Sequence, residues 1–126
     1  MQTLLLVEDD KLTRLQKEHA LKKAGYNVIT AADGMEALQV AHDGHPNLIL
    51  LDMMLPKLDG PSVLRGLKAD PLTAKIPVVV VTGLSQRNES KLIRDGAAAF
   101  VEKDALLNSS EPLLIAIKKI LEGSEA

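Results

Sequence analysis

Asp52 is the residue of this sequence whose position most needs a chemical explanation. It directly follows the apolar run Leu48–Leu51 and precedes the largely apolar residues 53–56, so no helix begins there for its carboxylate to cap. A carboxylate without a partner in apolar surroundings is costly. We therefore expect Asp52 to have a partner or a task, and a carboxylate can serve as a metal ligand or as a nucleophile.

Further acidic residues, Glu8, Asp9 and Asp10, follow the apolar run Leu4–Val7. Sites in open α/β sheets form outside the carboxyl ends of the strands, near the point where the strand order reverses. If the two runs form neighbouring strands, Glu8, Asp9 and Asp52 converge there. Their repulsion would either raise a pKa or be relieved by a cation, and hard oxygen ligands suit Mg²⁺. With Mg²⁺ bound, Asp52 could attack a phosphoryl group.

Two more strand ends carry residues that suit phosphoryl transfer. Thr82 ends one apolar run and Lys103 closely follows another. The Lys103 ammonium could bind a phosphoryl oxygen, the Thr82 hydroxyl could donate to a second oxygen, and Gly83 would let backbone amides approach closely. Ordinary structural explanations also exist: a solvated strand end for Lys103, a cap or turn for Thr82, and helix capping for Asp10 and Asp9.

The elements that must position these residues are short apolar runs separated by segments with helix signals. Several runs are unbroken rather than alternating, which is typical of strands buried on both faces of a parallel sheet. Strands are expected at Leu4–Val7, Val28–Thr30, Leu48–Leu51, Val78–Thr82 and Ala99–Val101. Helices are expected at Lys11–Ala24, Gly34–His42, Ser62–Lys68, Gln86–Asp95 and Pro112–Leu121.

Strict alternation of strand and helix predicts an α/β fold of the (βα)₅ type. We expect a doubly wound, five-stranded parallel sheet in the flavodoxin-like order 2-1-3-4-5, within a three-layer α/β/α arrangement. No linker rich in Pro, Gly or Ser divides the chain. One domain is therefore expected over residues 1–122, with residues 123–126 as a disordered tail or the remnant of a linker.

Composition excludes several classes of function. The chain contains no cysteine, which rules out disulfides, thiolate nucleophiles and Cys-ligated metal sites. Its net charge of −2 and the absence of a basic stripe argue against direct nucleic-acid binding, and Tyr26 and Phe100 are its only aromatic residues. The first apolar run is too short for a signal peptide or a membrane span. We expect a cytoplasmic protein with no membrane partner.

The helix expected at 11–24 carries leucines on two opposite sides. Leu12, Leu15 and His19 cluster on one side, and Leu21 lies about 180° away at the helical period. Both sides cannot face the sheet. Either the extra leucines are ordinary exposed apolar residues while long side chains such as Lys17 extend to solvent, or Leu12, Leu15 and His19 form a docking face for a partner helix.

Taken together and in order, these residues resemble the receiver domains of two-component response regulators, which have the fold of the chemotaxis response regulator. The resemblance covers nearly the whole chain. It rests on residues 6–10 (LVEDD), 32–34 (ADG) with 36–38 (EAL), 51–56 (LDMMLP) with 59–60 (DG), 76–78 (IPV) leading to 82–83 (TG), and 96–97 (GA) leading to Phe100 and Lys103.

The resemblance implies a role for each site residue. It makes Asp52 the phospho-acceptor, Asp9 a direct Mg²⁺ ligand and Glu8 a ligand through water. It also implies that the backbone carbonyl of Met54 binds Mg²⁺ and that Thr82 and Lys103 contact the phosphoryl group. Thr82 and Phe100 would form the switch pair that reports phosphorylation to the face made by helix 86–95, strand 99–101 and helix 112–121.

The resemblance also implies the partners. The phosphoryl donor would be a sensor histidine kinase or a histidine phosphotransfer protein, and the docking face on the first helix looks like the region where receivers meet such donors. Output would pass to a downstream effector protein or domain. The chain would act as a monomer or as a phosphorylation-dependent dimer.

Two departures from the family pattern stand out. Asp104 follows Lys103 where family members usually carry a cis proline. We expect a trans bond there, because a non-proline cis bond costs about 2.5–4 kcal/mol. Met54 and Leu84 stand where fast-dephosphorylating members position the hydrolytic water, and neither side chain hydrogen-bonds water strongly. The sequence therefore predicts slow self-dephosphorylation.

The function favoured so far is a signalling switch that is not itself an enzyme, and two other functions are alternatives to it. A phosphohydrolase that forms an aspartyl phosphate would carry a second Asp two residues after the nucleophile, where this chain has Met54. A phosphorylation-independent interaction module with a receiver fold would not require the set Glu8, Asp9, Asp52, Thr82 and Lys103 to be complete, as it is here. The switch is therefore the favoured interpretation.

Overall fold

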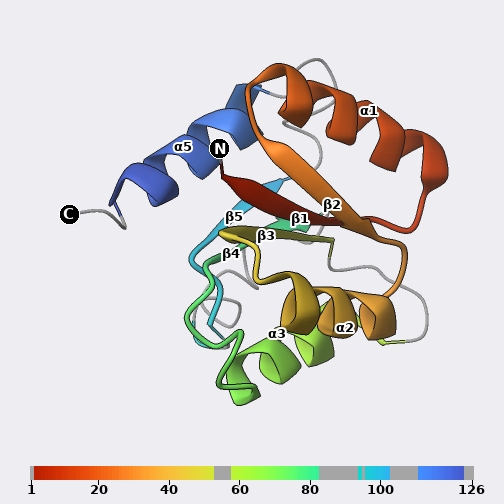
Figure 1. The fold of residues 1–126 in the computed structure, drawn as a ribbon, viewed down its shortest axis with the longest axis vertical. Coiled ribbons are helices and arrows are strands. Elements are labelled where there is room, and N and C mark those ends of the chain that lie inside the picture. The colour runs from red at the N-terminus through yellow and green to blue at the C-terminus, as the bar shows by residue number, and fades with distance from the viewer. Residues whose placement is uncertain (1, 53–57, 83–93, 95, 103–110, 124–126) are drawn as a thin grey trace.

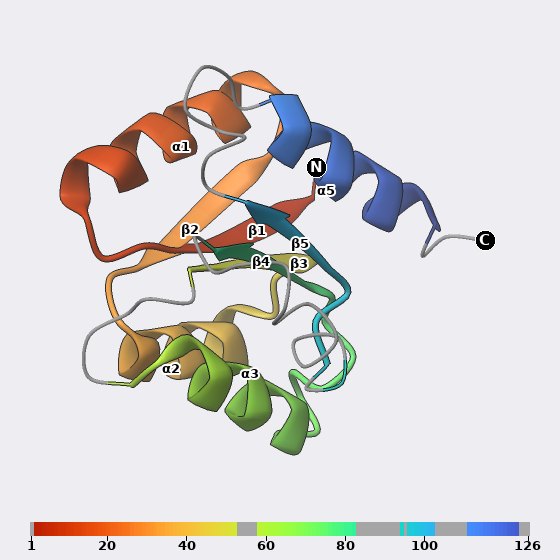
Figure 2. The same cartoon turned by 180° about the vertical axis from the view of Figure 1, so that it is seen from behind.

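The computed structural model describes residues 2–52, 58–82, 94, 96–102 and 111–123. Within them, five parallel strands form one sheet in the order β2-β1-β3-β4-β5 (Figures 1 and 2). The strands are β1 (Thr3–Val7), β2 (Asn27–Ala31), β3 (Leu48–Asp52), β4 (Val78–Thr82) and β5 (Ala99–Glu102). The expected α/β class and strand order are therefore confirmed.

Four described helices cover the two faces of the sheet. They are α1 (Lys11–Lys23), α2 (Gly34–Gly44), α3 (Gly60–Ala69) and α5 (Glu111–Gly123). Figures 1 and 2 show α1 and α5 on one face and α2 and α3 on the other, which gives three layers. The helix expected at 86–95 lies outside the described residues except for Arg94, which is helical. No helix in the described ranges is long and apolar enough to cross a bilayer.

Alternating side chains of the strands supply two separate apolar cores. Leu5, Val7, Ile49, Leu51 and Val80 pack with α2 and α3, whereas the intervening strand residues pack with α1 and α5. All five residues of β3 are buried, because β3 lies between β1 and β4 and both its faces are covered. This double burial explains why the strands are unbroken apolar runs in the sequence.

Aspartates cap the helices that follow strands or loops. The carboxylates of Asp10, Asp33 and Asp59 accept backbone N–H groups three residues later, at the starts of α1, α2 and α3. α1 and α2 begin at the residues expected from the sequence, whereas α3 begins at Gly60, two residues before the expected Ser62, because Asp59 is its cap. Gly25 ends α1 with a φ of 102°, a left-handed conformation that favours glycine.

Candidate functional site

The strand order reverses between β1 and β3. The connection from β1 to β2 passes through α1 on one face, and the connection from β2 to β3 passes through α2 on the other. Glu8 directly follows β1, and Asp52 is the last residue of β3. Both therefore stand at the carboxyl edge of the sheet, at the crevice where open α/β proteins place their sites.

Three carboxylates meet at this crevice. Oxygen atoms of Glu8, Asp9 and Asp52 all lie within 4.8 Å of one another. Glu8 and Asp52 are each only 2% exposed, whereas Asp9 is exposed. The expected convergence is therefore present. A cluster of oxygen donors with one member open to solvent fits a hard divalent cation such as Mg²⁺, which takes few protein ligands and keeps several waters.

The environment of Glu8 is unusual for a carboxylate. Burial raises its pKa, and the nearby Asp52 charge raises it further. Lys17 opposes this effect, because its Nζ lies 3.2 Å from Glu8 Oε1, and the Asp10 backbone N–H donates to Oε2 at 3.3 Å. Both carboxylate oxygens of Glu8 are thus held by donors, one from the middle of α1 and one from the connection between β1 and α1.

A second basic residue of α1 holds the backbone of the same segment. Arg14 Nη1 donates to the Glu8 carbonyl oxygen at 2.9 Å and to the Asp9 carbonyl oxygen at 3.4 Å. Sequence reasoning missed Arg14. One of its two interpretations of this helix had Lys17 extending to solvent, whereas the Lys17 side chain is only 13% exposed. The available signal was helical spacing, since residues 14, 17 and 21 share one side of α1 and Leu21 is buried.

Asp10 has a structural role. Its carboxylate accepts the Thr13 backbone N–H at 2.9 Å and also the Thr13 hydroxyl. These hydrogen bonds from Thr13 lower the pKa of Asp10. Asp10 is therefore the cap of α1, as its sequence position suggested.

The other expected site residues are only partly described. Thr82 is the last residue of β4, paired in register with Glu102 of β5. Phe100 lies in β5, partly buried against the core on the α2 and α3 side. The expectations for Met54, Gly83, Leu84, Lys103 and Asp104 fall outside the described residues.

The exposed side of α1 carries the residues expected to dock a partner. Leu12 and Leu15 are 65% and 51% exposed, and His19 is exposed as well. Leu21, on the opposite side, packs in the core. We call Leu12, Leu15 and His19 the α1 outer face, and it begins next to the acidic cluster because α1 follows Glu8–Asp10 directly.

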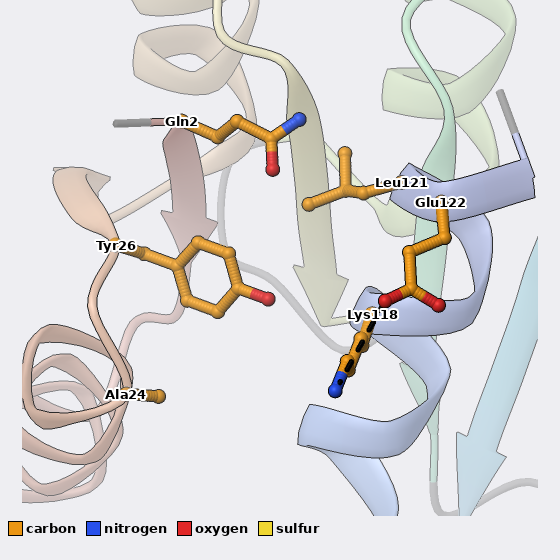
Figure 3. A pocket seen from close by; sticks show the side chains of 6 residues that line it. All are labelled: Gln2, Ala24, Tyr26, Lys118, Leu121 and Glu122. Atoms are coloured by element: carbon orange, nitrogen blue, oxygen red, sulfur yellow. Dashed lines mark ion pairs between the residues drawn. The ribbon is translucent and has the colours of Figure 1, made fainter. Parts of the chain in front are cut away.

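A cavity of about 280 Å³ lies at the other end of the sheet, where the strands begin. Figure 3 shows Tyr26 pointing its hydroxyl toward α5, where Lys118 pairs with Glu122 at 4.0 Å. Gln2, Ala24 and Leu121 complete the lining. This cavity contains none of the residues singled out as site candidates and is separate from the acidic cluster.

Comparison with known proteins gives consistent results. A family model described as the response regulator receiver domain matches residues 4–115. The polar-differentiation response regulator DivK of Brucella ovis is 34% identical over 102 residues, which cover 80% of this chain and 83% of DivK.

Solved structures agree with this match. The receiver domain of Francisella response regulator 1452 is 25% identical, with a TM-score of 0.89 over 98% of this chain and 99% of that one. The receiver domain of sensor histidine kinase PA1611 from Pseudomonas aeruginosa PAO1, solved with a magnesium ion coordinated in its active site cleft, is 29% identical. Its TM-score is 0.78 over 96% of this chain and 94% of that one. The chain therefore belongs to the receiver domain family of two-component response regulators.

Proposed function

We propose that this receiver domain accepts a phosphoryl group on the Asp52 carboxylate from a phosphohistidine of a sensor histidine kinase or a histidine phosphotransfer protein. The observation that carries the proposal is the position of Asp52. Its carboxylate is almost fully buried, at the carboxyl edge of the sheet, with oxygens within 4.8 Å of those of Glu8 and Asp9. A chain of the receiver family with this cluster has a nucleophile and a cation site in one place.

The residues of the cluster fit Mg²⁺. Asp9 and Asp52 would hold it directly, Glu8 would hold it through water, and the backbone carbonyl of Met54 would complete the protein's ligands. When bound, Mg²⁺ supplies positive charge that stabilises the charge developing on the transferred phosphoryl oxygens. The magnesium ion coordinated in the PA1611 receiver supports this assignment.

The transfer itself needs little from the protein beyond position and charge. One oxygen of the Asp52 carboxylate forms a bond to phosphorus while the bond from phosphorus to the donor's imidazole nitrogen breaks. The electron pair of that bond stays on the imidazole. Thr82 and Lys103 would donate to the phosphoryl oxygens, and the burial of Asp52 would limit the access of water to the acyl phosphate.

The output is proposed to run through Thr82 and Phe100. Phosphoryl oxygens at the end of β3 would draw in the hydroxyl of Thr82 at the end of the neighbouring β4. Phe100, in the next strand and only partly buried, would then move into the space that Thr82 leaves. The face made by the helix expected at 86–95, β5 and α5 would change shape and bind a downstream effector protein or domain.

The α1 outer face is the proposed contact for the phosphohistidine donor. Leu12 and Leu15 are large apolar side chains exposed beside the acidic cluster, which suits docking of an apolar helix face. A donor seated there would bring its histidine to Asp52.

Phosphorylation from a small donor tests the function without requiring a known partner. The full chain is incubated with acetyl phosphate, with Mg²⁺ or with EDTA, and the intact mass is measured. We expect a mass increment of one phosphoryl group that requires Mg²⁺ and is lost in Asp52→Asn. Continuous release of phosphate without an increment would indicate an enzyme, and neither result would indicate a phosphorylation-independent module.

A further inference from the structure

Lys17 forms an ion pair that differs from the other pair on its helix. Its Nζ lies 3.2 Å from Glu8 Oε1, and the two side chains are 13% and 3% exposed. Lys22 and Glu18 of the same helix pair at 2.8 Å, with side chains that are 56% and 23% exposed. Charges interact more strongly when they are shielded from water, so the Lys17 pair has the larger electrostatic effect.

The position of Lys17 on α1 is one where an apolar residue would normally pack. It lies on the inward side of the helix, one turn before the buried Leu21. Placing an ammonium group there costs desolvation energy, which only a well-placed partner offsets. Glu8 is that partner, and Glu8 also belongs to the acidic cluster.

Lys17 therefore reduces the negative charge of the proposed cation site. The carboxylates of Glu8, Asp9 and Asp52 are drawn together within 4.8 Å, and the Lys17 ammonium offsets part of their repulsion without any metal. A divalent cation that enters the cluster is repelled by this ammonium. It also meets a Glu8 whose two oxygens already accept hydrogen bonds, from Lys17 and from the Asp10 backbone.

We infer that Lys17 is a built-in counter-ion of the acidic cluster that weakens Mg²⁺ binding and so raises the Mg²⁺ concentration needed for phosphorylation of Asp52. The inference rests on the proposed function, because it concerns the same cation site. An alternative role for Lys17 has the opposite consequence. If Lys17 served only to orient Glu8 for the ion, its removal would weaken Mg²⁺ binding.

The sign of the change in Mg²⁺ affinity therefore decides between the two roles. Lys17→Met keeps the length and the helix propensity of the side chain but removes its charge. We expect the dissociation constant for Mg²⁺, measured by titration calorimetry of the full chain with MgCl₂, to fall about tenfold, which corresponds to ~1.4 kcal/mol. Lys17→Arg keeps the charge and should bind Mg²⁺ as the unmodified chain does.

Lys22→Met is the matched control. It removes the same charge from the same helix, and also breaks an ion pair, but the pair is exposed. Its Mg²⁺ dissociation constant should stay within about twofold of the unmodified value. The inference would be overturned if Lys17→Met and Lys22→Met had equal Mg²⁺ dissociation constants, or if the constant of Lys17→Met were larger than that of the unmodified chain. Either result would leave the proposed function intact.

Thermal unfolding with and without MgCl₂ gives a second readout. Loss of Lys17 leaves the buried Glu8 without its ion-pair partner, so the metal-free melting temperature should fall and the gain on adding Mg²⁺ should exceed that of the unmodified chain. Lys17→Gln, which retains a hydrogen-bond donor, provides the same test if Lys17→Met does not fold. If MgCl₂ raised the melting temperature of neither the unmodified chain nor any variant, both the proposed function and the inference would be overturned.

Discussion

Gly34, the first residue of α2, lies against Leu58, just before α3. A methyl group on Gly34 would fall 2.7 Å from the Leu58 Cβ and 2.7 Å from Val63 Cγ2, and it would also clash with the Leu58 backbone carbonyl. Because backbone cannot move aside cheaply, we expect Gly34→Ala to lower the free energy of unfolding by about 1–3 kcal/mol. Urea denaturation followed by circular dichroism measures the change.

Gly44→Ala is the control for this prediction. It adds the same methyl group to the same helix, but there the new Cβ meets the Ile29 Cδ1, the end of a flexible side chain, at 2.9 Å. Replacing glycine by alanine in a helix stabilises it by up to ~1 kcal/mol. This gain should offset the cost of moving the end of the Ile29 side chain, so the free energy of unfolding of the variant should be nearly unchanged. Equal urea midpoints for the two variants would contradict the role assigned to Gly34.

His42 of α2 and Asp70 after α3 form a pH-dependent link between the two helices. His42 Nδ1 lies 2.7 Å from Asp70 Oδ2. The hydrogen bond to Asp70 raises the pKa of His42, and the hydrogen bond from His42 lowers the pKa of Asp70. The link therefore stabilises the fold fully only between about pH 4 and about pH 6.5, which are the pKa values of aspartate and histidine in the unfolded chain.

The stabilisation by His42 should be lost as the pH rises through its raised folded pKa. We expect His42→Gln to lower the melting temperature at about pH 5.5 and to have a smaller effect at about pH 8.5. His19→Gln removes an exposed histidine of α1 and corrects for general effects of losing an imidazole. A His42→Gln effect that is equal at both pH values would contradict the link.

The α1 outer face should matter for a protein donor and not for a small one. We expect Leu12→Glu and Leu15→Glu each to slow phosphoryl transfer from a phosphorylated histidine phosphotransfer protein about tenfold or more, since each places a charge in an apolar contact. Phosphorylation by acetyl phosphate should be unchanged. Leu72→Glu, at an exposed leucine after α3, is the control and should leave both reactions unchanged.

The lifetime of the acyl phosphate is predicted from sequence. Met54 and Leu84 hydrogen-bond water poorly, so phospho-Asp52 should decay slowly, and Met54→Asn should accelerate the decay by positioning water. Mass spectrometry after removal of acetyl phosphate follows the decay. Loss of the phosphoryl group within seconds from the unmodified chain would contradict the prediction, as would an unchanged rate in Met54→Asn.

The sequence was sufficient for the fold because its strands are covered on both faces. Runs such as Leu48–Leu51 are then apolar throughout and stand out between capped helices. The exact first and last residues of the helices were less predictable. The second helix extends to Gly44 rather than His42, because His45 adopts the left-handed conformation that ends it.

The buried polar contacts that hold the connections between elements also could not be predicted from the sequence. In the segment after α3, Thr73 is buried and its hydroxyl donates to the Leu67 carbonyl at 2.6 Å. Lys68 Nζ donates to the Ala74 and Ile76 carbonyls, at 3.1 and 3.2 Å. Burial lowers the pKa of Lys68. Such contacts depend on three-dimensional proximity that residue spacing does not reveal.

The candidate site was predictable where chain direction alone places residues at strand ends. Glu8, Asp9 and Asp52 meet because parallel strands end at one edge of the sheet. The partnership of Lys17 with Glu8 was not predictable in the same way. Helical spacing gives the side of α1 on which Lys17 lies, but it does not show whether a buried carboxylate lies within ion-pair distance of that side chain.

Locating the phosphoryl group on the chain tests the central claim most directly. After reaction with acetyl phosphate and Mg²⁺, borohydride reduction converts an aspartyl phosphate into homoserine, which peptide mass spectrometry can place. We expect homoserine at position 52, and none when Mg²⁺ is chelated. Homoserine at another aspartate, or a phosphoryl group that survives borohydride on a different type of side chain, would contradict the assignment of Asp52 as the acceptor.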